Sequence, residues 1–111
     1  IPIYVGGTTT PALRRAARCE GWIGAGNAPG EVPALLAQIR GYRAELGKTM
    51  DGFETVIGLT TPFDPAQLAS LEEHGMSSAV NLPFRFSLGE RSSLDAKKRN
   101  MEDFANRFIR P

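Results

Sequence analysis

Short apolar, β-prone stretches alternate four times with segments of helical periodicity, and this alternation constrains the fold of the 111 residues more than any other feature. The expected strands are residues 1–5, 22–25, 53–60 and 79–82. Strands that alternate with helices favour a parallel sheet with right-handed crossovers. The sequence therefore predicts an α/β fold of four β–α units in one segment, residues 1–111, with no linker.

The expected helices begin and end at recognisable residues. Thr10 suits the N-cap of the first helix and Pro11 its first position, and we expect this helix to end at Gly21. Asp64 before Pro65 marks the start of the third helix. The second helix has the clearest period, with apolar residues three, four and seven apart. They are Val32, Leu35, Leu36, Ile39, Tyr42 and Leu46.

The C-terminal part is expected to be a loop followed by one more helix. Residues 84–93 read as the loop, and Ser92 or Ser93 as the residue that begins the helix. One side of this helix carries the apolar residues Leu94, Met101, Phe104, Ala105, Phe108 and Ile109.

Two closures fit four β–α units: an open doubly wound sheet, or an arc of a (β/α)8 barrel. A complete barrel usually needs about 250 residues, so four units would form half of one. The chain starts inside an expected strand with Ile1 rather than Met, which indicates a fragment or a processed product.

Composition excludes several classes of function. The 13 Lys and Arg residues nearly balance the 12 Asp and Glu residues, which argues against a nucleic-acid partner. No run approaches the roughly 20 apolar residues of a membrane span. With Cys19 and His74 as the only residues of their kinds, neither an internal disulfide nor a Cys/His metal site is expected. A reducing, cytoplasmic setting fits this cysteine usage.

The turn after the first expected strand is the best candidate for a ligand site. Ligands of parallel α/β folds bind beyond the carboxyl ends of the strands. Gly6, Gly7 and Thr8 stand at such an end and lead into a helix N-terminus, which favours an anion such as phosphate. The alternative is a plain strand-to-helix turn with an N-cap.

The loop after the second strand offers a weaker signal. Residues 24–29 resemble the start of a dinucleotide fingerprint, but Pro29 interrupts the pattern and the third glycine is displaced to Gly30. A backbone contact to a ligand somewhere in this loop is the remaining expectation. Cys19, Trp22 and His74 are expected to be structural: Cys19 buried or half-buried, Trp22 in the core, His74 near the last carbonyls of a helix.

Residues 1–7, 12–18 and 20–22 resemble the fifth strand, following helix and sixth strand of the luciferase-like monooxygenase family. Members are (β/α)8 barrels that use FMN or a 5-deazaflavin coenzyme in hydride transfer or oxygen insertion. Glu20 stands where the commonest family form has an aspartate. The resemblance covers essentially the whole chain, which would supply strands five to eight, the C-terminal half of such a barrel.

The resemblance implies roles for the candidate residues. Gly6 and Gly7 would approach the phosphate or ribityl side of the cofactor, Thr8 would donate beside them, and Gly26 and Asn27 would border cofactor or substrate. The family draws most isoalloxazine contacts and its usual proton-handling side chains from the first four strands. No catalytic residue is therefore assigned here, and we expect the isolated chain to be inactive.

The implied partners are a flavin-type cofactor, a small organic substrate, and either the missing N-terminal half or a second copy in a homo-oligomer. A second hypothesis is a non-catalytic half-barrel that self-associates, because four parallel strands leave edges and an inner face uncovered. A third is a small open α/β module that binds phosphate.

Overall fold

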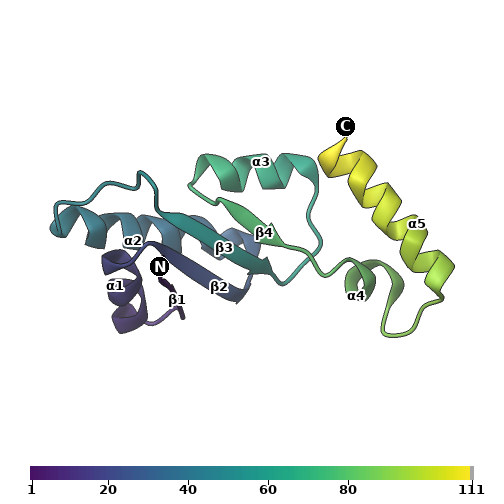
Figure 1. The fold of residues 1–111 in the computed structure, drawn as a ribbon, viewed down its shortest axis with the longest axis horizontal. Coiled ribbons are helices and arrows are strands. Elements are labelled where there is room, and N and C mark those ends of the chain that lie inside the picture. The colour runs from purple at the N-terminus through teal and green to yellow at the C-terminus, as the bar shows by residue number, and fades with distance from the viewer. Residues whose placement is uncertain (111) are drawn as a thin grey trace.

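A computed structural model, described for residues 1–110, shows a four-stranded parallel sheet in an α/β fold (Figure 1). Its strands are β1 (Tyr4–Gly6), β2 (Gly21–Asn27), β3 (Glu54–Leu59) and β4 (Ser78–Val80). They lie in the order β1-β2-β3-β4, so each strand pairs only with its neighbours in the sequence. The predicted α/β class and parallel sheet are confirmed.

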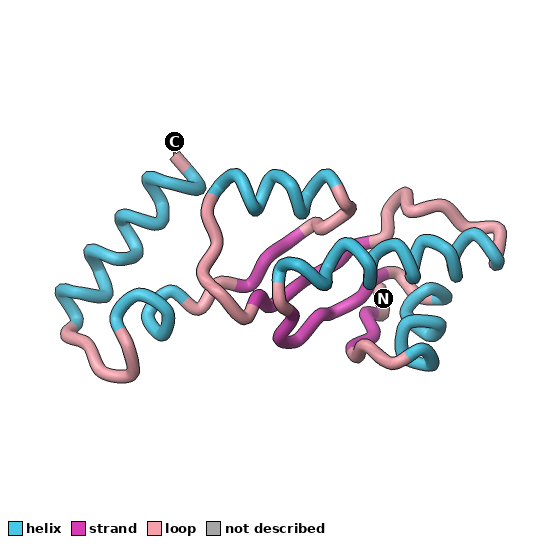
Figure 2. The backbone as a smooth tube through the Cα atoms, turned by 180° about the vertical axis from the view of Figure 1, so that it is seen from behind, coloured by secondary structure: helices cyan, strands magenta, loops and turns pink. Residues whose placement is uncertain are grey.

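Three helices pack against one face of the sheet: α1 (Thr10–Arg18), α2 (Val32–Glu45) and α3 (Pro65–Glu73). Figure 2 shows α2 in front of the strands when the molecule is seen from behind. The core lies between these helices and the sheet. Its largest fully buried side chains are Leu13, Trp22, Leu36, Ile39, Ile57 and Leu59.

The opposite face of the sheet carries apolar side chains that α1, α2 and α3 leave uncovered. Successive residues of a strand point to opposite faces, so Trp22 is fully buried while its neighbour Ile23 is 39% exposed. Val80 of β4, on the same open face, is 44% exposed. Burying apolar groups of this size against a partner would remove them from water and be favourable.

The predicted helix starts are right for α3 and off by one residue for α1. Asp64 caps α3, and its Oδ1 accepts from the Gln67 amide at 2.8 Å. The N-cap of α1 is Thr9 rather than Thr10, because the extended Thr9 turns its Oγ1 toward the Ala12 amide. Capping at Thr9 makes Thr10 the first helical residue.

The expected end of α1 at Gly21 is wrong. The helix ends at Arg18, and Cys19 is already extended. Arg43 of α2 donates to the carbonyls of Ala17 and Cys19, which satisfies the open end of α1 without a left-handed glycine. Gly21 is instead the first residue of β2.

The predicted strands exist, but their bounds differ. The first strand begins at Tyr4 rather than at residue 1, and Ile1 and Ile3 lie outside it as exposed residues. The second strand extends beyond the expected residues 22–25 to include Gly26 and Asn27. A short 3₁₀ turn, Pro29–Glu31, then leads into α2.

The C-terminal part differs most from expectation. Residues 83–88 form the short helix α4 (Pro83–Leu88) where a loop was predicted. Ser93 caps α5 (Leu94–Phe104) as predicted, and the chain continues as a π-helical turn, Ala105–Ile109.

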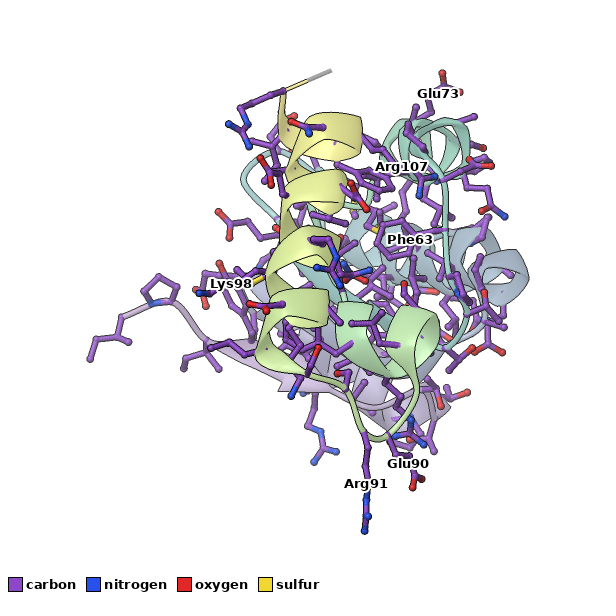
Figure 3. All side chains as sticks on the ribbon, turned by 90° about the vertical axis from the view of Figure 1, so that its right-hand side faces the viewer. Phe63, Glu73, Glu90, Arg91, Lys98 and Arg107 are labelled. Atoms are coloured by element: carbon purple, nitrogen blue, oxygen red, sulfur yellow. The ribbon has the colours of Figure 1, made fainter. Side chains whose placement is uncertain are left out.

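The apolar side of α5 is not buried, and α4 and α5 extend beyond the carboxyl end of the sheet (Figure 1). One contact between the C-terminal segment and the loop before α3 is aromatic. Phe104 stacks on Phe108 at 4.5 Å, and Phe108 meets Phe63 edge-on at 5.6 Å. Figure 3 shows Phe63 and Arg107 on the side of α5 that faces α3. Within residues 1–110 no helix combines the length and the apolar character that crossing a bilayer requires.

Candidate functional site

The turn after β1 and the end of β2 meet around one cavity of about 390 Å³ at the carboxyl end of the sheet. The cavity is lined by Gly7, Thr8, Gly26 and Asn27, together with Glu31 and residues of α2. The structure thus brings four of the five predicted residues to one place. The fifth, Gly6, is the last residue of β1, where it pairs with Ile23.

Two glycines of this cavity have backbones that other residues rarely adopt. Gly7 has a φ of 108°, and a Cβ there would lie 2.9 Å from the Cβ of Ala12. Gly26 has a φ of 103° and sits at a register shift between β2 and β3, where one extra residue is accommodated. Both positions therefore require glycine for the chain to turn around the cavity.

The core holds the Gly7 turn in place. The indole Nε1 of Trp22 donates to the Gly7 carbonyl at 2.8 Å, and the ring itself is fully buried between sheet and helices. Because a buried indole N–H needs an acceptor, Trp22 and Gly7 position each other. Trp22 is a core residue, as predicted, and it also orients the candidate site.

Asn27 forms the opposite wall. Its side chain is only 3% exposed, and its Nδ2 donates to Glu31 Oε1 at 3.1 Å. The same Oε1 accepts from the Ala28 amide at 3.1 Å, which closes the loop into α2. Asn27 Oδ1 has no partner among the described residues. Gly24 makes room for it, since a Cβ there would lie 2.4 Å from Oδ1.

The two walls differ in electrostatic character. On one side Thr8 precedes the N-terminus of α1, whose first turn contains no acidic residue. The positive end of a helix and a hydroxyl donor favour an anion. On the other side Glu31 presents carboxylate oxygens, of which Oε1 already accepts two hydrogen bonds. The cavity can therefore bind a ligand that carries both an anionic group and hydroxyl donors.

A second, larger cavity of about 600 Å³ lies on the open face of the sheet. It shares Ala25 and Gly26 with the smaller cavity, so the two adjoin at the end of β2. Arg85 and Phe86 of α4 form part of its wall. The sequence analysis did not predict this cavity, because it expected a loop at residues 84–93 and not the helix α4 that forms part of the wall.

A hydrogen-bonded pair stands at the other, amino-terminal end of the strands. The Tyr4 hydroxyl donates to a Glu54 carboxylate oxygen across Gly21, and this hydrogen bond raises the pKa of the phenol. Gly21 is needed between them because a Cβ there would lie 2.7 Å from the Glu54 carbonyl oxygen.

Glu20, the residue before β2, contacts the start of the chain. Its carboxylate accepts from the Ile3 amide at 2.8 Å, and this hydrogen bond lowers the pKa of the Glu20 carboxyl. No local sequence pattern predicts this contact, which lies at the end of the sheet away from both cavities.

The other residues considered from the sequence have structural surroundings. Cys19 is half-buried, and His74 Nδ1 lies 2.8 Å from the Ser70 carbonyl oxygen at the end of α3, as predicted for both. No group of three or more His, Cys, Asp or Glu side chains that could hold a metal ion occurs in the described part of the chain.

Comparisons with known proteins give relatives without an assigned activity. No protein-family model matches the chain. A protein of Mycobacterium tuberculosis and one of Mycobacterium bovis are each 38% identical to it. Each alignment is 112 residues long and covers 98% of this chain. Both are named only as uncharacterized proteins. The chain spans 38% of the length of each relative, so the matched region is one part of a longer polypeptide in them.

Proposed function

We propose that residues 1–111 form strands five to eight of a (β/α)8 barrel in a flavin- or deazaflavin-dependent oxidoreductase of the luciferase-like monooxygenase type. In this proposal the 390 Å³ cavity holds the phosphate end of the cofactor. The observation that carries the proposal is the convergence of Gly7 and Thr8, from the turn after β1, and of Gly26 and Asn27, from the end of β2, on that cavity.

The topology supports a barrel arc over a doubly wound sheet. A doubly wound sheet reverses its strand order at a switch point and has helices on both faces. Here the order β1-β2-β3-β4 runs in one direction, and the core helices lie on one face. In a closed barrel the open face would line the interior, with the paired Ile23 and Val56 in a packed layer and Val80, two positions nearer the carboxyl end, at the mouth.

The lining of the cavity fits the phosphate end of a flavin-type cofactor. Gly7 and Gly26 let the backbone approach a ligand closely, and the Thr8 hydroxyl can donate to a phosphate oxygen. Glu31 keeps its negative charge although its Oε1 accepts from Asn27 and Ala28, so the proposal places the phosphate on the Thr8 side of the cavity. FMN and a 5-deazaflavin coenzyme share this phosphate chemistry, so the fit does not choose between them.

A bound flavin or deazaflavin would supply the hydride or electron transfer. The chain's own residues would bind and orient the cofactor. Thr8 and the α1 N-terminus would hold its phosphate end, and the hydrogen-bonded Asn27 and Glu31 close the side of the cavity. Apart from Glu31, no acid or base lines this cavity within residues 1–110. The proposal therefore assigns proton transfer to strands one to four, and a cytoplasmic location of the whole enzyme stays a prediction.

The test is a fluorescence titration of FMN and of a 5-deazaflavin into the 111-residue chain and into the full-length polypeptide in which the proposal places it. The full-length polypeptide should bind one of them tightly, and the isolated chain weakly or not at all. Thr8→Val should weaken binding roughly tenfold or more, since a hydrogen bond to a charged group contributes about 1.5–3 kcal/mol.

The control for that variant is Thr10→Val, which removes a hydroxyl at the first position of α1 outside the cavity. It should leave the affinity unchanged. A full-length polypeptide that binds neither cofactor would refute the proposal, and equal losses for both threonine variants would remove the phosphate role from Thr8.

A second candidate function is self-association of the half-barrel. It is supported by the exposed apolar residues Ile23, Val80 and Leu82 on the open face. β1 and β4 are the two edges of the sheet, so two copies could close an eight-stranded ring. Sedimentation of the 111-residue chain tests this idea, and a well-folded monomer at high concentration would rule it out.

A further inference from the structure

The 600 Å³ cavity on the open face combines an apolar wall with a single cation. Most of the wall consists of apolar residues, namely Ile23, Val56, Val80, Leu82 and Phe86. Strand positions that face this side near the carboxyl end hold small residues, Ala25 and Gly58, and these hollow out the sheet. A space of this size matches the pockets in which proteins bind small organic molecules.

Arg85 is the one charged residue of that wall. It stands on α4, directly after β4, and is exposed. No carboxylate lies within 4 Å of it in the part of the chain that the structure describes. On its other side it borders a hollow lined by Glu90 and Lys97, whose opposite charges nearly cancel at a distance. The guanidinium is therefore free to bind an anion at the rim of an apolar cavity.

We propose that this cavity takes an apolar small molecule with one anionic group, such as an aliphatic or aromatic carboxylate, and that Arg85 binds the anionic group. An apolar body in the cavity leaves water, while its anionic head stays at the rim beside the guanidinium. A neutral or cationic molecule of the same size lacks that last contact, so charge decides specificity.

The position of the cavity gives this ligand a role. Ala25 and Gly26 line both cavities, so a molecule in the larger one adjoins whatever occupies the smaller one. The inference rests on the proposed function for calling this molecule the substrate, but its binding needs no flavin. The two ideas can therefore fail separately.

The experiment is a calorimetric titration of the 111-residue chain with hexanoate, octanoate, octan-1-ol and octylammonium, each below its micelle concentration. Octanoate should bind best of the three eight-carbon probes. Hexanoate should bind about fifteenfold more weakly than octanoate, because each buried methylene contributes about fourfold in affinity.

Variants separate the charge from the cavity. Arg85→Gln should lower the octanoate affinity about tenfold or more and leave the octan-1-ol affinity unchanged. The matched control is Arg91→Gln, because Arg91 extends away from the body of the molecule in Figure 3 and lies outside the cavity wall. It should change neither affinity.

A second variant fills the cavity without straining the backbone. A Cβ at Gly58 would lie 3.5 Å from Gly24 O and Gly26 N, an ordinary contact, so Gly58→Ala should fold normally. It should weaken octanoate and octan-1-ol together by a few-fold. Far-UV circular dichroism checks that each variant keeps its fold.

Three results would overturn the inference: no octanoate binding, octylammonium or octan-1-ol binding as tightly as octanoate, or an unchanged octanoate affinity in Arg85→Gln. Octanoate binding in a full-length polypeptide that ignores FMN and deazaflavin would leave this cavity assignment standing and refute the proposed function. Cofactor binding without octanoate binding would do the reverse.

Discussion

Arg43 is expected to be the polar side chain on which the stability of this chain depends most. It is 8% exposed, and its guanidinium lies over the Phe53 ring at 4.6 Å. It donates to the carbonyls of Ala17, Cys19 and Thr49 at 3.0, 3.1 and 2.7 Å. One side chain thus joins the end of α1, the helix α2 and the loop before β3.

Arg43→Met keeps the apolar stem and removes all of these donors, leaving three carbonyl oxygens without their partner. A hydrogen bond to a charged group contributes about 1.5–3 kcal/mol, and losses within one cluster add incompletely. We therefore expect a loss of about 3–4 kcal/mol in the free energy of unfolding. For a domain of this length the same loss lowers Tm by roughly 12 °C or more.

The assay is urea unfolding followed by circular dichroism at 222 nm, with Arg40→Met as the control. Arg40 stands on the same helix but is exposed, with one hydrogen bond, to the His74 carbonyl oxygen at 3.2 Å. Its substitution should cost within about 0.5 kcal/mol. Arg43→Lys should fall between the two, because an ammonium keeps the charge but not the planar set of donors. Equal losses for Arg43→Met and Arg40→Met would refute the reasoning.

Three further outcomes are expected. Because Glu54 raises the folded-state pKa of Tyr4, the stability from this pair is complete below the unfolded phenol pKa and is lost as pH rises through the folded pKa. In a titration of tyrosine absorbance at 295 nm, Glu54→Gln should move the ionisation of Tyr4 to lower pH. A Tyr4 ionisation at unchanged pH would show that Glu54 does not raise its pKa. Glu20 behaves oppositely: its lowered folded-state pKa gives stability above the unfolded carboxyl pKa that is lost as pH falls through the folded pKa. Glu20→Gln should therefore flatten the acid side of a plot of Tm against pH, and a curve identical to that of the parent chain would argue against this contact. Gly7→Ala should cost about 1–3 kcal/mol through its positive φ and the close approach to Ala12, as measured by urea unfolding, and a loss below about 0.5 kcal/mol would show that the turn can relax.

The helical period of residues 32–46 shows both the power and the limit of the sequence. It predicted α2, and Val32, Leu36 and Ile39 are buried as their spacing requires. The next inward position of the same stripe is Arg43, which hydropathy assigns to the surface. Its partners lie on α1 and on a loop far away in sequence, and no local pattern reveals such contacts.

The candidate site was also predictable only where local sequence signals determine the structure. Gly7 and Thr8 could be placed at a strand end from local signals alone, and parallel strands bring such ends together. The extension of β2 through Gly26 and Asn27 depends on pairing with β3 across an extra residue, which only the partner strand determines. The short helix that carries Arg85 escaped prediction because Pro83 and Gly89 resemble loop punctuation.

The sequential strand order also has a kinetic meaning. Every strand pairs with one reached through a single helix, so no pairing has to wait for distant parts of the chain. Each β–α unit can add to the preceding one as the polypeptide leaves the ribosome, and the growing edge is always the most recent strand. In stopped-flow refolding we therefore expect the 111-residue chain to regain its secondary structure at a rate that does not depend on protein concentration. A rate that rises with concentration would show that a second chain is needed before the sheet can form.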